Sequence, residues 1–341
     1  MKKKNKYKVT ILVPVFNEIK NLNKLFINLN NIVRNRPYKV FFLDGGSNDG
    51  TFQKLLEFQK KNKKIFIFKN KKKTTQHALI LGLKKSDTPF IAFLGAHTNY
   101  PKNYIDECLK QIKDKNLVGC SGITKFYRSG SLNSELATRV LISKFGTSSH
   151  SSRNLTEGYS NILPYPVYNR KIIEKIGSFD KNLDRNQDNN LSKRLIKKGY
   201  KLFITNKTHT IYHGPKNLFE LIKYAHKYGF GNGRMLFLRK PGLSYYHFVP
   251  LLFSINFLFY IFSLYIVIPF QLNFLINLGI SLYIIFNFFN SIMICVTTKK
   301  ITYLIISLYF LIFHLSYGFS TILGFLNMKL YSIPYIFRKK I

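Results

Sequence analysis

Short apolar runs alternate with segments of helical periodicity through the first third of the chain. Four apolar runs predict buried strands: residues 8–15, 39–43, 65–68 and 90–94. Between them, apolar residues recur every three or four positions and predict helices over about residues 18–33, 51–61 and 74–85. We expect Asn17 to be the N-cap of the first helix. The alternation is typical of an α/β fold in which helices cover both faces of a largely parallel sheet.

The stretch FIAFLGAHTNYP, residues 90–101, joins the fourth predicted strand to a turn. This turn contains Gly95, Ala96 and His97, and Pro101 stands where the next helix is expected to begin. Ligands of open α/β sheets bind just beyond the carboxyl ends of the strands. We therefore expect the turn to lie at a ligand-binding site.

Beyond residue 116 the alternation becomes less regular. Three further strands are predicted: about residues 117–126, 163–168 and 202–205. His209 and His213 in HTIYH, residues 209–213, alternate as on another strand. A helix is predicted over residues 170–176, and RNQDNN at 185–190 opens another that ends before Gly199. Residues 129–152 are polar and are expected to form a partly helical loop.

The chain changes character after Glu220, its last acidic residue. Residues 217–238 are amphipathic, which suits either a helix lying in a membrane interface or an ordinary helix packed on the folded domain. Three apolar stretches follow, each long enough for a membrane span of about 20 residues: about 247–269, 272–296 and 301–326. We therefore predict three regions: an α/β domain over residues 1–215, an amphipathic interfacial region over 216–240, and a membrane region with about three transmembrane helices over 241–341.

The chain is strongly basic, with 53 Lys and Arg against 15 Asp and Glu and a formal net charge of +38. Nucleic acid would suit that charge, but the lysines are scattered among asparagines, and no RNP, zinc-finger or tandem basic-helix pattern accompanies them. The positive-inside rule and contact with anionic lipid or phosphate explain the charge more simply. We therefore predict a multi-pass protein of the cytoplasmic (inner) membrane, with its α/β domain in the cytoplasm and no nucleic-acid partner.

The two ends of the chain bear on this topology. MKKKNKYKVT at the N-terminus leads directly into a strand without an apolar segment, so no cleavable signal peptide is predicted. With the α/β domain inside, Lys299 and Lys300 also face inside, and Arg338, Lys339 and Lys340 would lie outside, against the charge rule. Either the last apolar stretches form a re-entrant hairpin, or the tail is an exception. The three cysteines show neither pairing nor metal-site spacing.

Polar motifs follow the first two predicted strands. VPVFNE at residues 13–18 and DGGSNDG at 44–50 place polar groups at the carboxyl end of each strand. Asp44 can accept a hydrogen bond from a base or a sugar, and the glycines allow the backbone to approach a ligand closely. A DGGS turn alone is more often only a turn. Two such motifs on adjacent strands, followed by TTQHALILGL at 74–83, indicate a nucleotide site.

These three segments resemble the nucleotide-binding half of the family 2 glycosyltransferases, which have a GT-A fold, an α/β fold with a Rossmann-like mixed sheet. GAHTNYP at residues 95–101 and RNQDNN at 185–190 resemble more closely the succinoglycan-type glucosyltransferase subgroup, in which membrane segments follow the catalytic domain. The resemblance covers nearly the whole chain, and its motifs occur in the order of the family. It implies a GT-A catalytic domain followed by C-terminal transmembrane helices.

The resemblance also implies roles for individual residues. A nucleotide-binding set is implied: Pro14, Asn17, Glu18, Asp44, Gly46 and Gly95. Within it, Asp44 would bind the uracil or an equivalent base. His97 would help to hold a divalent metal, Mg²⁺ or Mn²⁺, against the diphosphate, and Asp188 would be the general base of an inverting transfer. Gln187 and Arg234 would contact phosphate or the acceptor.

The sequence departs from the family pattern at three places. The first aspartate of the metal-binding motif is Gly95 here, so a metal at His97 would otherwise depend on water and phosphate oxygens. Asn190 stands where the subgroup usually has an acidic residue, and a Gln-x-x-Arg-Trp-like segment is represented only by YGFGNGR around Arg234. The simpler readings are that His97 is a solvated or capping histidine, and that Asp188 only caps its helix.

The sequence is compatible with two alternative functions. The first is a membrane-anchored inverting glycosyltransferase that moves a sugar from a nucleotide-sugar donor, such as a UDP-sugar, to a polyprenyl-linked glycan acceptor in cell-surface polysaccharide synthesis. The alternative is a catalytically impaired relative that serves as a binding or scaffold subunit, since Gly95 replaces the usual aspartate. An inactive relative does not need a general base, and the Asn-Gln-Asp motif is intact, which favours the enzyme. The sequence does not identify the sugar, the linkage or the acceptor.

Overall fold

The computed structural model describes residues 6–127, 130–147, 154–183 and 185–332. The chain forms two compact units. The first unit comprises Met1–Tyr127 and Leu155–His213, and the second comprises Arg128–Asn154 and Gly214–Ile341. The candidate nucleotide-binding residues all belong to the first unit.

Four parallel strands form one half of the sheet in the first unit. Their order across the sheet is β3 (Ile65–Lys69), β2 (Tyr38–Asp44), β1 (Val9–Val15) and β4 (Phe90–Phe93). The four strands predicted from apolar runs are confirmed, each within about one residue of its expected bounds. Because β1 and β2 pair in register, Val15 lies beside Asp44, and their carboxyl ends reach the same edge.

The other half of the sheet is mixed. Its strands are β8 (Val167–Asn169), β6 (Gly119–Tyr127), β9 (Leu202–His213), β5 (Thr98–Asn99) and β7 (Gly158–Tyr159). β8 runs antiparallel to β4 and β6, β6 runs parallel to β9, and both short strands run antiparallel to β9. The strands predicted over residues 202–205 and 209–213 are both confirmed, but they are parts of one strand, β9, which runs to His213.

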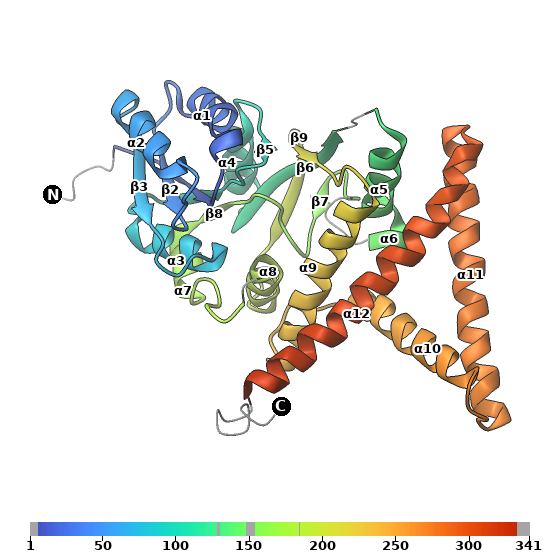
Figure 1. Cartoon of the computed structure of the whole chain (residues 1–341). Helices are drawn as coiled ribbons and strands as arrows, with labels where there is room; N and C mark the ends of the chain where they lie inside the picture. Colours follow the sequence, from blue (N-terminus) through green and yellow to red (C-terminus); the bar gives the residue numbers. More distant parts are fainter. Residues whose placement is uncertain (1–5, 128–129, 148–153, 184, 333–341) are drawn as a thin grey trace. The chain divides into compact units, whose positions relative to one another are not determined.

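Helices cover both faces of the sheet, and β1 shows why (Figure 1). Its alternate residues Val9, Ile11 and Val13 enter one core, while Leu12 enters the other, as expected for side chains that alternate across a strand. Helices of the first core are α1 (Ile19–Val33), α2 (Thr51–Lys61) and α4 (Tyr104–Asp114). Helices of the second core are α3 (Thr75–Lys85), α7 (Arg170–Lys175) and α8 (Gln187–Lys197).

Two predicted helix starts are wrong. Asn17 does not cap α1: the N-cap is Glu18, without a side-chain capping bond, and Asn17 has φ 55°. The Asn17 side chain bonds to a neighbouring loop instead, and asparagine tolerates the left-handed conformation better than most residues. The helix expected at Pro101 begins at Tyr104, because residues before it form the short strand β5 and a turn.

The second unit is helical where the structure describes it. Its α-helices are α5 (Leu132–Ile142), α6 (Lys144–Thr147), α9 (Leu218–Phe237), α10 (Val249–Ser263), α11 (Phe270–Thr298) and α12 (Ile306–Ser332). Two 3₁₀ turns join them: η1 (Tyr245–His247) and η2 (Ile301–Ile305). Within the described residues, three segments are long and apolar enough to cross a membrane: Tyr245–Ser263, Phe270–Thr298 and Ile301–Asn327. The basic tail at residues 338–340 lies outside the described residues.

Helix α9, the predicted amphipathic segment, packs closely against α12. A Cβ added to Gly229 or Gly233 would overlap backbone carbonyl oxygens of α12, and one added to Gly324 of α12 would overlap a carbonyl of α9. His226 and Ser320 form a hydrogen bond across this contact, with 2.9 Å between Nδ1 and Oγ. Small residues at a helix contact allow such close approach, as they do between membrane helices. The placement of α9 in a membrane interface stays a prediction.

Candidate active site

Hydrogen bonds join the loops that follow β1 and β2 into one surface. The backbone N–H of Asn17 donates to Ser47 Oγ at 2.9 Å, and the Asn17 side-chain oxygen accepts from the backbone N–H of Asn48 at 3.0 Å. The backbone N–H of Glu18 donates to Thr51 Oγ1 at 2.8 Å. The two sequence motifs are therefore parts of a single structure at the carboxyl edge of the sheet, where α/β folds bind ligands.

Asp44, the last residue of β2, folds the second loop around its carboxylate. Its side chain is buried; Oδ1 accepts from Ser47 Oγ at 2.6 Å, and Oδ2 accepts from the backbone N–H of Gly46 at 3.0 Å and of Ser47 at 3.2 Å. Gly46 has φ 81°, which glycine adopts without a steric penalty. A carboxylate offers about four acceptor positions. Asp44 thus organises the loop and keeps capacity for one further donor.

Two residues at this edge were missed by the sequence analysis. Phe16 is 51% exposed, and its ring lies against Gly45, where an added Cβ would come within 3.3 Å of Phe16 Cδ2. Lys73 places its Cε 3.6 Å from the position of a Cβ on Gly46. Phe16 lies inside the VPVFNE motif, so an aromatic residue at an exposed strand end was the available signal. No sequence signal indicated Lys73, because it comes from the turn after β3.

The turn between β4 and β5 meets the first loop through His97 and Glu18. His97 Nε2 lies 2.8 Å from Glu18 Oε1; the His97 side chain is 66% exposed, but that of Glu18 is only 10% exposed. Asn21 Nδ2 donates to the other Glu18 oxygen at 3.2 Å and lies 3.3 Å from His97 Nδ1. The hydrogen bond that His97 donates to the Glu18 carboxylate raises the pKa of His97. The pair therefore favours a protonated histidine at the edge of the site.

Gly95 occupies a space that a larger residue could not enter without moving its neighbours. A Cβ on Gly95 would come within 2.9 Å of the Tyr165 ring. The Gly95 N–H donates to the Tyr100 hydroxyl oxygen at 2.8 Å. Burial raises the pKa of Tyr100, so its hydroxyl stays neutral. Glycine is therefore the residue that suits this position, because Tyr100 and Tyr165 pack around the turn.

Asp188 lies in the first turn of α8, as the sequence predicted. Its side chain is exposed, and Oδ1 accepts from the backbone N–H of Asn189 at 2.9 Å. The helix packs through Leu191 and Leu195 in the same core as Phe93, the last residue of β4. The same core thus holds the strand that leads to Gly95 and the helix that bears Asp188.

Asn190 and Arg194 fix the start of α8. Asn190 is buried, and its Oδ1 accepts from Arg194 Nε at 3.0 Å. Arg194 also donates from Nη1 to the carbonyl of Ile176 at 2.7 Å, which ties α8 to the end of α7. Asn190, which stands where the subgroup usually has an acidic residue, is thus used in packing.

The comparisons with known proteins identify the family. A sequence model of the Glycosyl transferase family 2 matches residues 10–177. The dolichyl N-acetyl-alpha-D-glucosaminyl phosphate 3-beta-D-2,3-diacetamido-2,3-dideoxy-beta-D-glucuronosyltransferase of Methanococcus voltae is 30% identical over 325 residues, which cover 91% of this chain and 95% of that protein. The chain belongs to glycosyl transferase family 2.

Two further matches agree with this. The succinoglycan biosynthesis protein ExoA of Rhizobium meliloti is 23% identical over 229 residues, covering 66% of this glycosyltransferase and 68% of that protein. The solved structure of the mannosyltransferase PcManGT from Pyrobaculum calidifontis, in complex with GDP-Man and Mn²⁺, superposes with a TM-score of 0.57 at 13% identity and covers 91% and 86% of the two chains. The predicted GT-A fold and the predicted family are therefore confirmed.

The residues of this glycosyltransferase do not by themselves make a divalent-metal site. Among the described residues, no three His, Cys, Asp or Glu side chains gather as a metal-binding group. Hard cations prefer six or more oxygen ligands. Here Gly95 supplies no side-chain ligand, and His97 is paired with Glu18. The Mg²⁺ or Mn²⁺ that we predicted from the resemblance stays a prediction.

The remaining predicted site residues lie in different places. Pro14 is half-buried within β1, in register with Leu43 one position before the carboxyl end of β2. Gln187 is the first residue of α8 and is half-buried. Arg234 lies on α9 and so belongs to the second unit of this glycosyltransferase. The predicted contacts of Gln187 and Arg234 with phosphate or acceptor stay predictions.

Proposed function

We propose that this glycosyltransferase transfers a sugar, with inversion, from a nucleotide-sugar donor to a lipid-linked acceptor. The observation that supports this most is the exposed Asp188 carboxylate, on a helix that packs in one core with β4. β4 leads directly to the turn of Gly95 and His97. An exposed carboxylate that can accept a proton is the group that an inverting transfer requires.

The donor would bind along the joined loops after β1 and β2. The exposed Phe16 ring offers a face for a base, and the remaining acceptor capacity of Asp44 suits a base or ribose donor. We propose a UDP-sugar as the donor, as the resemblance to the family implies. The cations Lys73 and His97 would then lie near the diphosphate, where they stabilise the charge that develops on the leaving group.

The reaction follows from these groups. The acceptor hydroxyl oxygen attacks the anomeric carbon of the donor sugar, and Asp188 takes the hydroxyl proton. The bond from that carbon to the phosphate oxygen breaks on the opposite face, and its electron pair leaves with the nucleoside diphosphate. Inversion at the anomeric carbon is the consequence. A positioned general base typically contributes about 10²–10⁴-fold to such a rate.

A lipid-linked acceptor is supported by two observations. By its name, the Methanococcus voltae relative acts on a dolichyl-linked sugar phosphate. Three segments among the described residues are long and apolar enough to cross a membrane. We propose a polyprenyl-phosphate-linked glycan as acceptor, and a multi-pass protein of the cytoplasmic membrane. Its basic catalytic domain would face the cytoplasm, as the positive-inside rule indicates.

The substitution Asp188→Asn tests this function. Asparagine keeps the shape of the side chain but cannot accept the proton, so transfer should fall by about 10²–10⁴-fold. UDP binding should stay nearly intact, because Asp188 is not part of the joined loops. The assay uses membranes containing the chain, a panel of nucleotide sugars and a polyprenyl-phosphate-linked acceptor. Asp114→Asn, at the exposed end of α4, is the matched control.

Transfer by Asp188→Asn at the wild-type rate would remove Asp188 from the mechanism. A wild-type chain that binds UDP but transfers no sugar from any donor would favour the binding-subunit alternative, for which the tyrosine packing around Gly95 is the supporting observation.

A further inference from the structure

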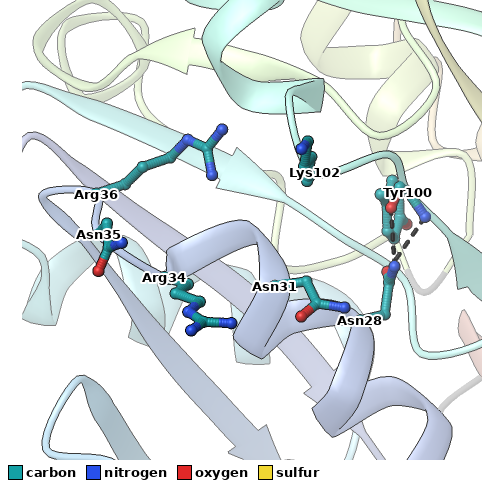
Figure 2. A pocket seen from close by; sticks show the side chains of 7 residues that line it. All are labelled: Asn28, Asn31, Arg34, Asn35, Arg36, Tyr100 and Lys102. Carbon is teal, nitrogen blue, oxygen red and sulfur yellow. Dashed lines mark hydrogen bonds between the residues drawn. The ribbon is translucent and has the colours of Figure 1, made fainter.

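A basic pocket of about 600 Å³ lies in the first unit, and none of its lining residues belongs to the joined loops after β1 and β2. Tyr100 is shared with the surroundings of Gly95, to which its hydroxyl bonds. Figure 2 shows the residues that line it: Asn28, Asn31, Arg34, Asn35, Arg36, Tyr100 and Lys102. Five of them belong to α1 and the turn that follows it, and the other two come from the segment that leads into α4. Three are cations and none is acidic, and the volume is within the range of small-molecule sites.

One of the cations is held in place. Arg36 Nε donates to Asp106 Oδ2 at 2.5 Å, and the other Asp106 oxygen accepts from the hydroxyl of Tyr38. Arg36 Nη1 lies 3.3 Å from the carbonyl oxygen of Ile32. Arg36 Nη2 has no hydrogen-bond partner within the described part of the chain. The guanidinium is thus fixed by two contacts and still has donors to offer, which is how arginine recognises phosphate and carboxylate groups.

The other two cations have uncompensated charge. Arg34 and Lys102 are exposed, and neither forms an ion pair with any residue that the structure describes. Arg34 is the C-cap of α1, where a cation interacts favourably with the helix dipole. That explanation does not extend to Lys102, which comes from a separate segment. Two uncompensated cations that converge on one pocket would be stabilised by an anion.

The rest of the lining indicates the kind of anion. The three asparagine amides can bond to hydroxyls, and Asn28 is held by Tyr100, donating to its carbonyl at 2.8 Å and accepting from its N–H at 3.1 Å. Tyr100 is the only large apolar side chain of the lining, so the pocket does not suit an acyl or prenyl chain. The volume also exceeds that of a phosphate ion alone, which points to a phosphate on a polar scaffold.

We propose that this pocket binds a phosphate group carried by a polar scaffold, at a site distinct from that of the nucleotide donor. Arg36 would supply the positioned contact, and Arg34 and Lys102 would supply charge. A soluble sugar phosphate and the headgroup of an anionic lipid share this chemistry. The experiment below tells the two sources apart.

Isothermal titration calorimetry on the full chain in detergent tests the proposal. One arm uses glucose 6-phosphate and the other uses dihexanoyl phosphatidic acid, both with saturating UDP present so that the donor site is filled. The double variant Arg34→Gln/Lys102→Gln should weaken saturable binding at least about tenfold, the scale of lost charged hydrogen bonds. Lys20→Gln/Lys24→Gln, which removes two exposed charges from the same helix α1, should bind like the wild type.

Each outcome has a defined meaning. Binding of glucose 6-phosphate that the Arg34 and Lys102 variant loses supports the proposal and identifies a soluble ligand, while the same result with the phosphatidic acid alone identifies a lipid headgroup. No saturable binding of either probe overturns it, and so does an equal loss in the Lys20 and Lys24 variant. Circular dichroism checks that the variants fold, and no readout depends on sugar transfer.

Discussion

The joined loops after β1 and β2 differ from the turn after β4, although all three follow parallel strands to the same edge of the sheet. The two loops share backbone-to-side-chain bonds at Asn17 and Glu18 and are built around the buried Asp44. The β4 turn reaches them through the half-exposed pair of His97 and Glu18. The turn also contacts Asn21, Tyr100 and Tyr165.

A nucleotide-sugar site has two tasks: it binds the nucleoside, and it stabilises the charge of the diphosphate. The joined loops are held in place before any ligand arrives, which reduces the entropy lost on binding. In the proposed site they would bind the base and ribose. The β4 turn would then face the phosphates with a histidine and without the usual aspartate. We therefore expect affinity for the nucleoside to be robust, and stabilisation of the diphosphate to depend on cations and pH.

The largest effect is expected from the joined loops. Asp44→Ala removes a buried carboxylate that accepts from three donor groups of its own loop, the Ser47 hydroxyl and the backbone N–H groups of Gly46 and Ser47. UDP affinity should fall by about 1–3 kcal/mol, or roughly fivefold to 150-fold. Calorimetric titration with UDP measures the change, and Asp44→Asn should lose less because one oxygen remains.

Asp114→Ala, in an exposed position at the end of α4, controls for the loss of one negative charge in a basic chain. Unchanged UDP affinity in a folded Asp44→Ala variant would place Asp44 outside the nucleotide site and would leave it with a purely structural role in the loop.

An intermediate effect is expected at the β4 turn. Gly95→Asp adds a carboxylate, but its Cβ would meet the Tyr165 ring at 2.9 Å. Combined with Tyr165→Ala, the new aspartate should tighten Mn²⁺ binding in the presence of UDP by about tenfold, since added ligand charge raises the affinity for hard cations. Titration calorimetry with Mn²⁺ compares the double variant with Gly95→Asp alone, for which a smaller gain is expected. A double variant with wild-type metal affinity would show that this turn does not face the diphosphate.

The smallest effect concerns pH. Because Glu18 raises the pKa of His97, the histidine keeps its proton to a higher pH than usual, and UDP binding should weaken as the pH rises through that pKa. Glu18→Gln should lower the pKa and move the midpoint of this loss to lower pH. Proton NMR of the His97 ring and UDP titrations between pH 5 and 9 measure both. Coincident midpoints for the wild type and the variant would contradict the coupling.

Folding stability should change with pH in the same direction as UDP binding. A pKa that is raised on folding stabilises the protein fully below the unfolded value of 6.5, and this contribution is lost as the pH rises through the folded value. His97 is 66% exposed, so the pair should contribute no more than about 1 kcal/mol.

Much of the fold could be predicted from periodicity. Strands β1 to β4 and helices α2 and α3 were expected within about one residue, because buried parallel strands and amphipathic helices leave strong patterns. The join between the strands predicted at residues 202–205 and 209–213 was missed, because the polar residues between them, Asn206, Lys207 and Thr208, lack an apolar run. The start of α4 was misplaced, because nothing near Pro101 indicates the two-residue strand β5.

The residues of the proposed site were indicated by the sequence, and their contacts came from the structure. The sequence indicated Asp44, His97 and Asp188, but it did not show that His97 pairs with Glu18. That contact joins residues about 80 positions apart, and no local pattern encodes it. Tyr165, which occupies the space next to Gly95, was missed for the same reason.

The glycine contacts between α9 and α12 impose an order on biosynthesis. Helix α9, Leu218–Phe237, leaves the ribosome before α10 and α11, and its partner α12 begins only at Ile306. At about 5–20 residues per second, α9 waits on the order of 3–20 s for the helix on which its glycine face packs. Completion of the second unit therefore depends on a segment made well after the whole first unit has emerged.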